Sequence, residues 1–283
     1  MEKDTIKITP SLLRIFMQDR KNDTHKHDYG HALIVAGCET MPGAAVMATG
    51  AALHSGCGLV TLRSTRTAAQ AAMTRYPSAM LSVDKDEVLA SGIADTHRYS
   101  AIGIGPGLGR DQRTIEVLWQ VLTEAKQHDI PMVLDADALS IISANEPLRE
   151  RIPEGSILTP HEGELRRLIP SEGEEAIMSF CKEHGVYLVR KGYHTRIYSP
   201  EGFVYENTTG NPGMAKGGSG DVLTGLLTGL LARGHSSLAA AMTGVWIHGY
   251  AGDRLTEERT AECWCAQELI DFLYLGFKEI CGK

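Results

Sequence analysis

The chain has 283 residues and a formal net charge of −7, with 43% hydrophobic and 22% charged residues. This composition is ordinary for a soluble globular protein, and the acidic balance argues against nucleic acid or an anionic membrane surface as the main partner. The first residues are too polar for a signal peptide, and no apolar run reaches membrane-spanning length. We therefore expect a cytoplasmic protein that folds as a single domain over residues 1–283.

Neither disulfides nor a zinc site is indicated. The six cysteines are irregularly spaced, and Cys263-Trp264-Cys265 has neither a zinc nor a thioredoxin spacing. A reducing compartment is the simplest setting for them. His25, His27 and Asp28 form a cluster that is able to ligate a metal, but no further ligand spacing supports it, so an exposed loop is the favoured interpretation.

The first clear pattern is a strand, a helix and a second strand. Residues 31–36 are a compact β-rich run, an Ala-rich helix is predicted over 44–54, and 59–62 is the next strand. This is a βαβ unit, which favours a parallel sheet. Small residues at 43–45 either let a substrate approach or only allow close helix packing, and the residues leave both interpretations open.

The middle of the chain repeats this alternation. A strand from residue 100 runs into GPGLG, which is not GxGxxG, so a dinucleotide site of the Rossmann type is unsupported. The strand beginning at 131 ends in Asp135 and Asp137, whose spacing on a strand predicts that one faces the cleft. Helix N-capping by Asp137 and a magnesium or substrate role are equally supported. Further elements are predicted as helices over 66–73 and 113–128 and a strand over 80–83.

Two later strands also end in polar loops. His161 follows the strand that begins at 156, and Lys191 follows the strand over 186–190. Residues 196–198 and 203–205 form a predicted hairpin. Helices are expected over 238–250 and 266–280, and His248 is interpreted as a core histidine. Because parallel strands end at one edge of the sheet, we expect the polar loops to gather there.

The segment 211–231, NPGMAKGGSGDVLTGLLTGLL, is the most informative part of the chain. Glycines let the backbone approach a ligand closely, and the start of a helix directs several amide groups at one point, which suits phosphate. Gly217, Gly218, Ser219 and Gly220 are therefore the predicted anion loop. Asp221 follows and is either a plain N-cap or a base that takes a proton from an attacking hydroxyl; we favour the base. No P-loop and no protein-kinase motif set is present.

With these motifs in hand, the chain resembles the ADP/ATP-dependent NAD(P)H-hydrate dehydratases of the ribokinase-like superfamily over nearly its whole length. The resemblance is carried by HALIVAGCETMPGAAVMATG, GIGPGLG, VLDADAL, ILTPHEGEL, VRKGYHT and NTTGNPGMAKGGSGDVLTGLLTGLLARG. The last of these is long and specific. The implied fold is α/β, with a mostly parallel central sheet and helices on both faces.

The resemblance implies repair of hydrated NADH and NADPH, called NAD(P)HX. The 6-hydroxyl of the S epimer is phosphorylated by ADP or ATP, with Mg²⁺ as cofactor, and phosphate then leaves. The family's hydrate contacts fall on Ala44, Gly107, His161 and Asp221, and its nucleotide contacts on Lys191, Gly192, Tyr193, His194, Thr195 and Gly220. A homo-oligomer, a homotetramer by resemblance, and a functional link to a separate NAD(P)HX epimerase are also implied. The metal ligands, the preferred nucleotide and the preferred hydrate are not indicated.

Two positions depart from the family pattern, because Lys216 and Ser219 stand where Thr is common. Ser219 keeps the hydroxyl, and Lys216 either assists phosphate binding or points to solvent. Two rival functions are a kinase of the same superfamily that acts on a vitamin-precursor alcohol and a nucleotide-binding sensor without turnover. Incubation with NADHX and ADP separates the dehydratase from both.

Overall fold

The computed structural model describes residues 5–17, 19–171 and 173–282. Within these residues the strands form one sheet of ten, in the order β1-β10-β9-β8-β7-β6-β5-β2-β3-β4. Only β9 runs antiparallel to its neighbours β8 and β10, so the predicted mostly parallel sheet is confirmed. The strands are β1 Ile6–Lys7, β2 His31–Val35, β3 Leu59–Ser64, β4 Met80–Val83, β5 Ala101–Ile104, β6 Met132–Leu134, β7 Ile157–Leu158, β8 Tyr187–Arg190, β9 Arg196–Tyr198 and β10 Val204–Glu206.

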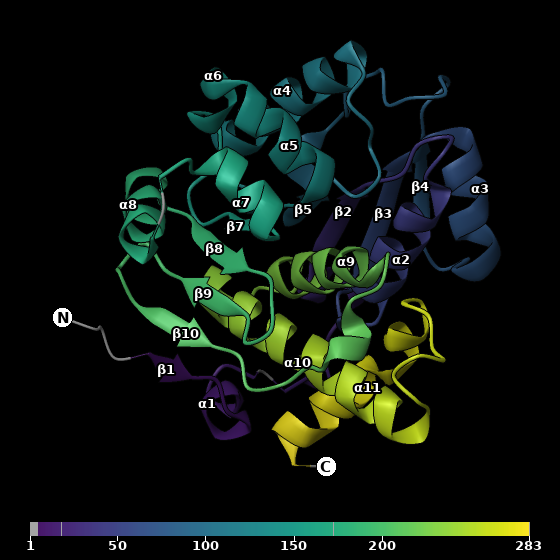
Figure 1. Ribbon diagram of the computed structural model, residues 1–283. Coiled ribbons are helices and arrows are strands. Elements are labelled where there is room, and N and C mark those ends of the chain that lie inside the picture. Colours follow the sequence, from purple (N-terminus) through teal and green to yellow (C-terminus); the bar gives the residue numbers. More distant parts are fainter. Residues whose placement is uncertain (1–4, 18, 172, 283) are drawn as a thin grey trace.

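Helices cover both faces of this sheet, as the sequence predicted (Figure 1). Alternate side chains of β2 show why: Ala32 and Ile34 belong to one hydrophobic core, whereas Leu33 and Val35 belong to the other. The helices are α1 Pro10–Arg14, α2 Pro42–Leu53, α3 Arg66–Arg75, α4 Gln112–Gln127, α5 Ala136–Ala144, α6 Glu146–Arg149, α7 Glu162–Leu168, α8 Glu174–His184, α9 Ser219–Ala232, α10 Ser237–Glu258 and α11 Glu268–Cys281. Residues of α2, α9, α10 and α11 build the first core, and those of α4, α5, α7 and α8 build the second.

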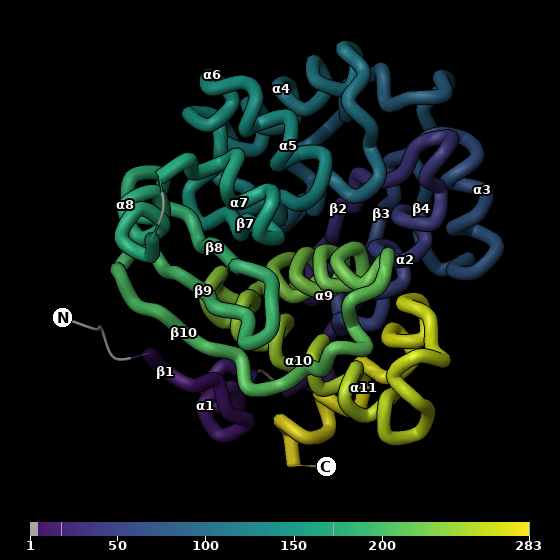
Figure 2. The backbone as a smooth tube through the Cα atoms, in the orientation of Figure 1, coloured from purple at the N-terminus to yellow at the C-terminus, as the bar shows by residue number. Residues whose placement is uncertain are grey.

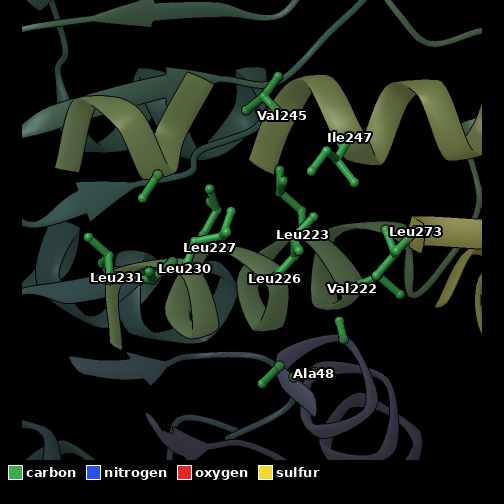
Figure 3. Packing of buried hydrophobic residues seen from close by; sticks show 14 of the residues in the cluster. Ala48, Val222, Leu223, Leu226, Leu227, Leu230, Leu231, Val245, Ile247 and Leu273 are labelled. Carbon is green, nitrogen blue, oxygen red and sulfur yellow. The ribbon is translucent and has the colours of Figure 1, made fainter. Parts of the chain in front are cut away.

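Helix α9 lies at the centre of the first core. Every residue from Val222 to Ala232 is buried, and Figure 3 shows its leucines between Val245 and Ile247 of α10 on one side and Ala48 of α2 on the other. A helix that is buried on every side along most of its length must be enclosed by other elements. Its position is therefore fixed by packing on all sides, which also fixes the loop that precedes it.

Small residues set the alignment of α2 against α9. A Cβ on Gly225 would lie 2.0 Å from the carbonyl oxygen of Ala48, and one on Gly229 would lie 2.9 Å from that of Ala52. The two helices therefore run in the same direction, since a step of four residues along α9 corresponds to a step of four residues along α2. Ala44 stands one turn before Ala48 on α2, and Asp221 stands one turn before Gly225 on α9.

Most predicted elements are confirmed, and two differences have physical causes. Helix α10 continues to Glu258 rather than ending at 250, because Ala251 and Leu255 remain buried in the first core. Helix α8 was not predicted, although it buries Ile177, Phe180 and Cys181. In the described part of the chain, no helix has the length and apolarity needed to span a membrane.

Candidate active site

The loops after β2 and β5 meet at the point where the strand order changes direction. β2 pairs with β3 on one side and with β5 on the other, and this is where open α/β sheets bind ligands. The amide of Gly37 donates to the carbonyl of Pro106 at 2.8 Å, and a Cβ on Gly107 would lie 2.8 Å from that of Ala44. Two of the four predicted hydrate residues, Ala44 and Gly107, therefore meet at this switch point, and Asp221 lies in the first turn of α9, the helix that packs against α2.

Asp221 is the third residue of α9 and does not cap it. The N-cap is Gly218, with φ 94°, and it makes no side-chain capping bond; the N-cap interpretation of Asp221 is therefore wrong. Burial and the neighbouring negative charge of Asp135 raise the pKa of Asp221 to about 6, against the opposing effect of Lys191. A half-buried carboxylate with a raised pKa near a cluster of amides is suited to accept a proton.

Asp135 and Lys191 form an ion pair next to this carboxylate. The Lys191 ammonium donates to Asp135 Oδ1 at 2.7 Å, and the Thr224 hydroxyl donates to Oδ2 at 2.8 Å. A Cβ on Gly220 would lie 3.5 Å from Lys191 Nζ. The predicted nucleotide residue Lys191 thus lies against the glycine loop, although it is 29 positions earlier in the chain.

A cavity of about 690 Å³ opens beside the glycine loop, a volume within the usual range for a ligand-sized pocket. All six predicted nucleotide residues line it, together with Ser219. Gly217 and Gly192 have no neighbouring atom within 4 Å of a built Cβ, so their backbones face open space. Tyr193 and His194 are exposed beside the cavity with their rings 4.0 Å apart. The residues that the family resemblance assigns to the nucleotide therefore lie together on one wall of this cavity.

His161 lies on the wall of this cavity and apart from the other three predicted hydrate residues, which do not line it. Its Nδ1 accepts the amides of Gly163 and Glu164 at 3.0 and 3.4 Å, so it caps α7. The ring is 58% exposed. A capped helix fixes the backbone while most of the ring stays available to a ligand.

Sequence reasoning predicted the opposite wall only in part, because residues 211–216 belong to the segment 211–231 that it singled out, whereas residues 207–210 and the α10 residues of this wall were missed. The wall consists of the segment between β10 and α9 and of residues on α10. Figure 2 shows the path of the backbone from β10 to α9. Asp253 accepts the amide of Gly210 and the side chain of Asn211, both at 2.9 Å, and Asn211 caps the turn at 212–214. The Asn-Pro pair in the sequence was the available signal for this turn.

His248 is buried in α10, as predicted for a core histidine, but it also lines the cavity. Its Nε2 lies 2.9 Å from the carbonyl oxygen of Ser219, so this nitrogen carries the proton. Burial lowers the pKa of His248 to about 4. A neutral imidazole therefore holds the first residue of α9 in place.

Lys216 lines the cavity, and its ammonium is held by other parts of the chain rather than pointing to solvent. Its ammonium donates to the carbonyls of Ala261 and Trp264 at 2.6 and 2.7 Å and lies 4.2 Å from the centre of the Trp264 ring. The charge ties the glycine loop to the segment before α11. This contact joins parts of the chain that are 45 and 48 residues apart.

Of the two interpretations of Asp137, the structure contradicts helix N-capping. The strand ends at Leu134 and Asp135 occupies the N-cap position of α5, so N-capping by Asp137 is wrong. Asp137 instead accepts the amide of Gly109 at 2.9 Å and lies 3.6 Å from the Arg110 guanidinium. It thereby fixes the GPGLG loop.

His25, His27 and Asp28 are all exposed, as predicted, but the segment is a short 3-10 helix over Lys26–Tyr29 with His25 at its N-cap rather than a plain loop. Among the described residues, no group of three or more His, Cys, Asp or Glu side chains is arranged for a metal ion. A magnesium ion bound mainly through phosphates and water needs no such group.

Comparison with known proteins gives relatives over most of the chain. An ADP-dependent (S)-NAD(P)H-hydrate dehydratase from Listeria monocytogenes is 34% identical, covering 89% of this chain and 90% of its own. A bifunctional NAD(P)H-hydrate repair enzyme from Moorella thermoacetica is also 34% identical, and this chain spans 52% of its length.

Solved structures agree with this relationship. The ADP/ATP-dependent NAD(P)H-hydrate dehydratase from Bacillus subtilis, co-crystallised with ATP and Mg²⁺, matches with a TM-score of 0.83 at 30% identity over 98% of this chain and 99% of its own. A ribokinase-like superfamily protein from Enterococcus faecalis matches with a TM-score of 0.85 at 26% identity over 97% and 96%. The predicted ribokinase-like fold is confirmed. The NAD(P)H-hydrate dehydratase family model matches residues 32–274, and the chain therefore belongs to that family.

Proposed function

We propose that this protein is an ADP-dependent (S)-NAD(P)H-hydrate dehydratase, a lyase that converts NAD(P)HX to NAD(P)H with release of AMP and phosphate. The observation that carries the proposal is the position of Asp221. The half-buried carboxylate has a raised pKa and stands in the first turn of α9, directly after the glycine loop, on the helix that packs against α2, which carries Ala44. We infer that a hydroxyl bound near Ala44 and Gly107 and a phosphoryl group bound at the glycine loop meet at this carboxylate.

The reaction follows from this placement. The 6-hydroxyl oxygen of the hydrate attacks the terminal phosphorus of ADP, its proton passes to Asp221, and the bond to AMP breaks. The carbon–oxygen bond at position 6 then breaks with loss of phosphate, and a proton leaves the adjacent ring carbon, which restores the double bond. Phosphate leaves far more readily than hydroxide, so a nucleotide is consumed to drive the dehydration.

The protein contributes binding and charge. The amides at the start of α9 are directed toward the phosphates, and Lys191 lies beside them. The cavity beyond takes the rest of the nucleotide, with Gly192 to Thr195 on its wall. Mg²⁺ would enter with the nucleotide and neutralise phosphate charge. His161 extends from the cavity wall and is assigned to the hydrate.

The test is an absorbance assay with purified protein, NADHX and either ADP or ATP, read at the reduced-nicotinamide band. Recovery of NADH that requires nucleotide and Mg²⁺ is expected. Consumption of nucleotide with a vitamin-precursor alcohol but not with NADHX would favour the rival kinase. Nucleotide binding without turnover of either compound would favour the sensor.

Four further assignments remain predictions: a single domain, a cytoplasmic location, a homo-oligomer and an epimerase partner on a separate chain. Size-exclusion chromatography with light scattering measures the oligomeric state directly. A pull-down with an NAD(P)HX epimerase, and assays with R and S hydrate in the presence of that enzyme, test the functional link.

A further inference from the structure

The Asp135 carboxylate is almost fully buried, at 1% exposed, and it does not line the cavity. Both of its oxygens nonetheless accept hydrogen bonds. Lys191, which lines the cavity, donates to Oδ1, and Thr224 of helix α9 donates to Oδ2. Asp135 therefore reaches the ligands only through Lys191. Burial of a charge is costly unless a partner compensates it, so this pair has to stay formed in the empty site.

The ion pair lies directly against the start of α9. A Cβ on Gly220 would lie 3.6 Å from Asp135 Oδ2 and 3.5 Å from Lys191 Nζ, and Asp221 is the next residue. The negative charge of Asp135 disfavours the ionised form of Asp221, and the positive charge of Lys191 favours it. The two partners thus act on Asp221 in opposite directions.

Other elements around Asp221 add little charge. The first turn of α2, residues 42–46, and the segment 105–109 contain no ionisable side chain. On α10, His248 is neutral because burial lowers its pKa to about 4, and Arg110 lies beside Asp137. The electrostatic environment of Asp221 is therefore dominated by the single pair at Asp135.

The backbone at this position is also unusual. Ala136, which follows Asp135, has φ 48° although it is not glycine. The carbonyl of Asp135 would lie 1.8 Å from a Cβ on Gly105. Strained backbone of this kind persists where the surrounding structure over-determines it, and it often marks a functional site.

We propose that Asp135 is a positioning residue of the reaction, which holds the Lys191 ammonium at the start of α9 and sets the balance of charge around Asp221. This inference rests on the proposed function. It assigns to Asp135 a role that requires its charge as well as its shape.

Two substitutions have opposite expected effects. Asp135→Asn keeps the size and one acceptor oxygen but removes the negative charge, so the acid limb of the kcat–pH profile moves to lower pH, on the order of one unit. Lys191→Gln leaves Asp135 uncompensated, so the acid limb moves to higher pH. If Asp135 served stability alone, the acid limb would not shift in either variant.

The same shifts are expected in a direct titration that needs no turnover. Carbon-13 NMR of Asp-labelled protein follows the Asp221 carboxyl group, which Asp221→Asn identifies by loss of its signal. Failure of the wild-type protein to process NADHX would reject the proposed function, whereas the titration would still test the pairing. Equal Asp221 titration midpoints in wild type, Asp135→Asn and Lys191→Gln would overturn the inference.

Asp137→Asn is the matched control, because it removes a carboxylate two residues away that contacts Gly109 and Arg110 rather than Lys191. The Asp221 midpoint should stay unchanged in this variant. Thr224→Val and Thr224→Ser separate support from charge: Val removes the hydroxyl donated to Asp135, and Ser restores it. If Asp135→Asn does not fold, the test is made with Lys191→Gln, because the native Lys191 side chain is 22% exposed and its replacement disturbs the core less. A downward shift, or no shift, of the Asp221 titration midpoint in this variant overturns the inference.

Discussion

Gly225 of α9 lies directly against the Ala48 carbonyl of α2, so closely that a methyl group on Gly225 would come within 2.0 Å of that oxygen. Ala44 stands one turn before Ala48 on α2, and Asp221 stands one turn before Gly225 on α9. A separation of the two helices would therefore displace the proposed base relative to Ala44.

Gly225→Ala is therefore expected to damage both stability and activity. The added methyl meets backbone rather than a flexible side chain, so the helices must shift, at a cost of roughly 1–3 kcal/mol of unfolding free energy or more. Chemical denaturation measures the loss. Gly217→Ala is the control for an added methyl group, since nothing lies within 4 Å of a Cβ there, and it should unfold at nearly the wild-type denaturant concentration.

Asp221→Asn should abolish most turnover while leaving nucleotide binding intact. Removal of a positioned general base typically lowers kcat by about 10²–10⁴-fold, whereas the cavity does not include the Asp221 side chain. Stopped assays give kcat, and calorimetry gives the affinity for ADP. Undiminished turnover in this variant would show that Asp221 is not the base.

Activity should fall as the pH is lowered through about 6, the value to which burial and Asp135 raise the pKa of Asp221. The base must be ionised to accept the proton, so kcat at pH 5 is expected to be about a tenth of its plateau if Asp221 alone controls the limb. A kcat–pH profile over pH 5–8 measures this. A profile that stays flat down to pH 5 would contradict the assignment.

The same pKa predicts that Asp221 reduces stability at neutral pH. Because the folded-state pKa is above the unfolded value of 3.8, the contribution of this group to stability is greatest below pH 4 and is lost as the pH rises through about 6. Asp221→Asn should therefore stabilise the protein at pH 8 by up to about 3 kcal/mol. The gain should vanish below pH 4. Thermal or urea unfolding at both pH values, wherever the protein remains folded, gives the comparison.

Lys216→Met should loosen the glycine loop. The variant loses the bonds to the carbonyls of Ala261 and Trp264 and the contact with the Trp264 ring. We expect the KM for ADP to rise several-fold, on the order of tenfold, because the amides of the loop are less well positioned, and we expect proteolysis of the 259–267 segment to become faster. Lys182→Met, at an exposed position of α8, controls for the loss of a charge. Equal KM values in the two variants would argue against a positioning role for Lys216.

Much of the fold is determined by local pattern. The strand at 31–35 and the later strands of the sheet alternate along the chain with helical segments. Strands that are buried on both faces are recognisable in the sequence as continuous apolar runs. The glycine loop with Asp221 is equally local, since glycine density and the start of a helix both lie within one short segment. For the same reason the wall formed by residues 191–195 could be assigned by motif.

The remaining features depend on tertiary structure. Asp135 is paired with Lys191, 56 residues away, and Asp253 supports Gly210 across 43 residues; no periodicity encodes such pairs. The raised pKa of Asp221 is likewise a property of burial and of Asp135, which comes from the end of a distant strand. Sequence pattern thus determined which residue types stand at the ends of the strands, whereas only packing of α9 between α2 and α10 decided which of them meet, because distance between charges is set by the fold and not by the order of residues.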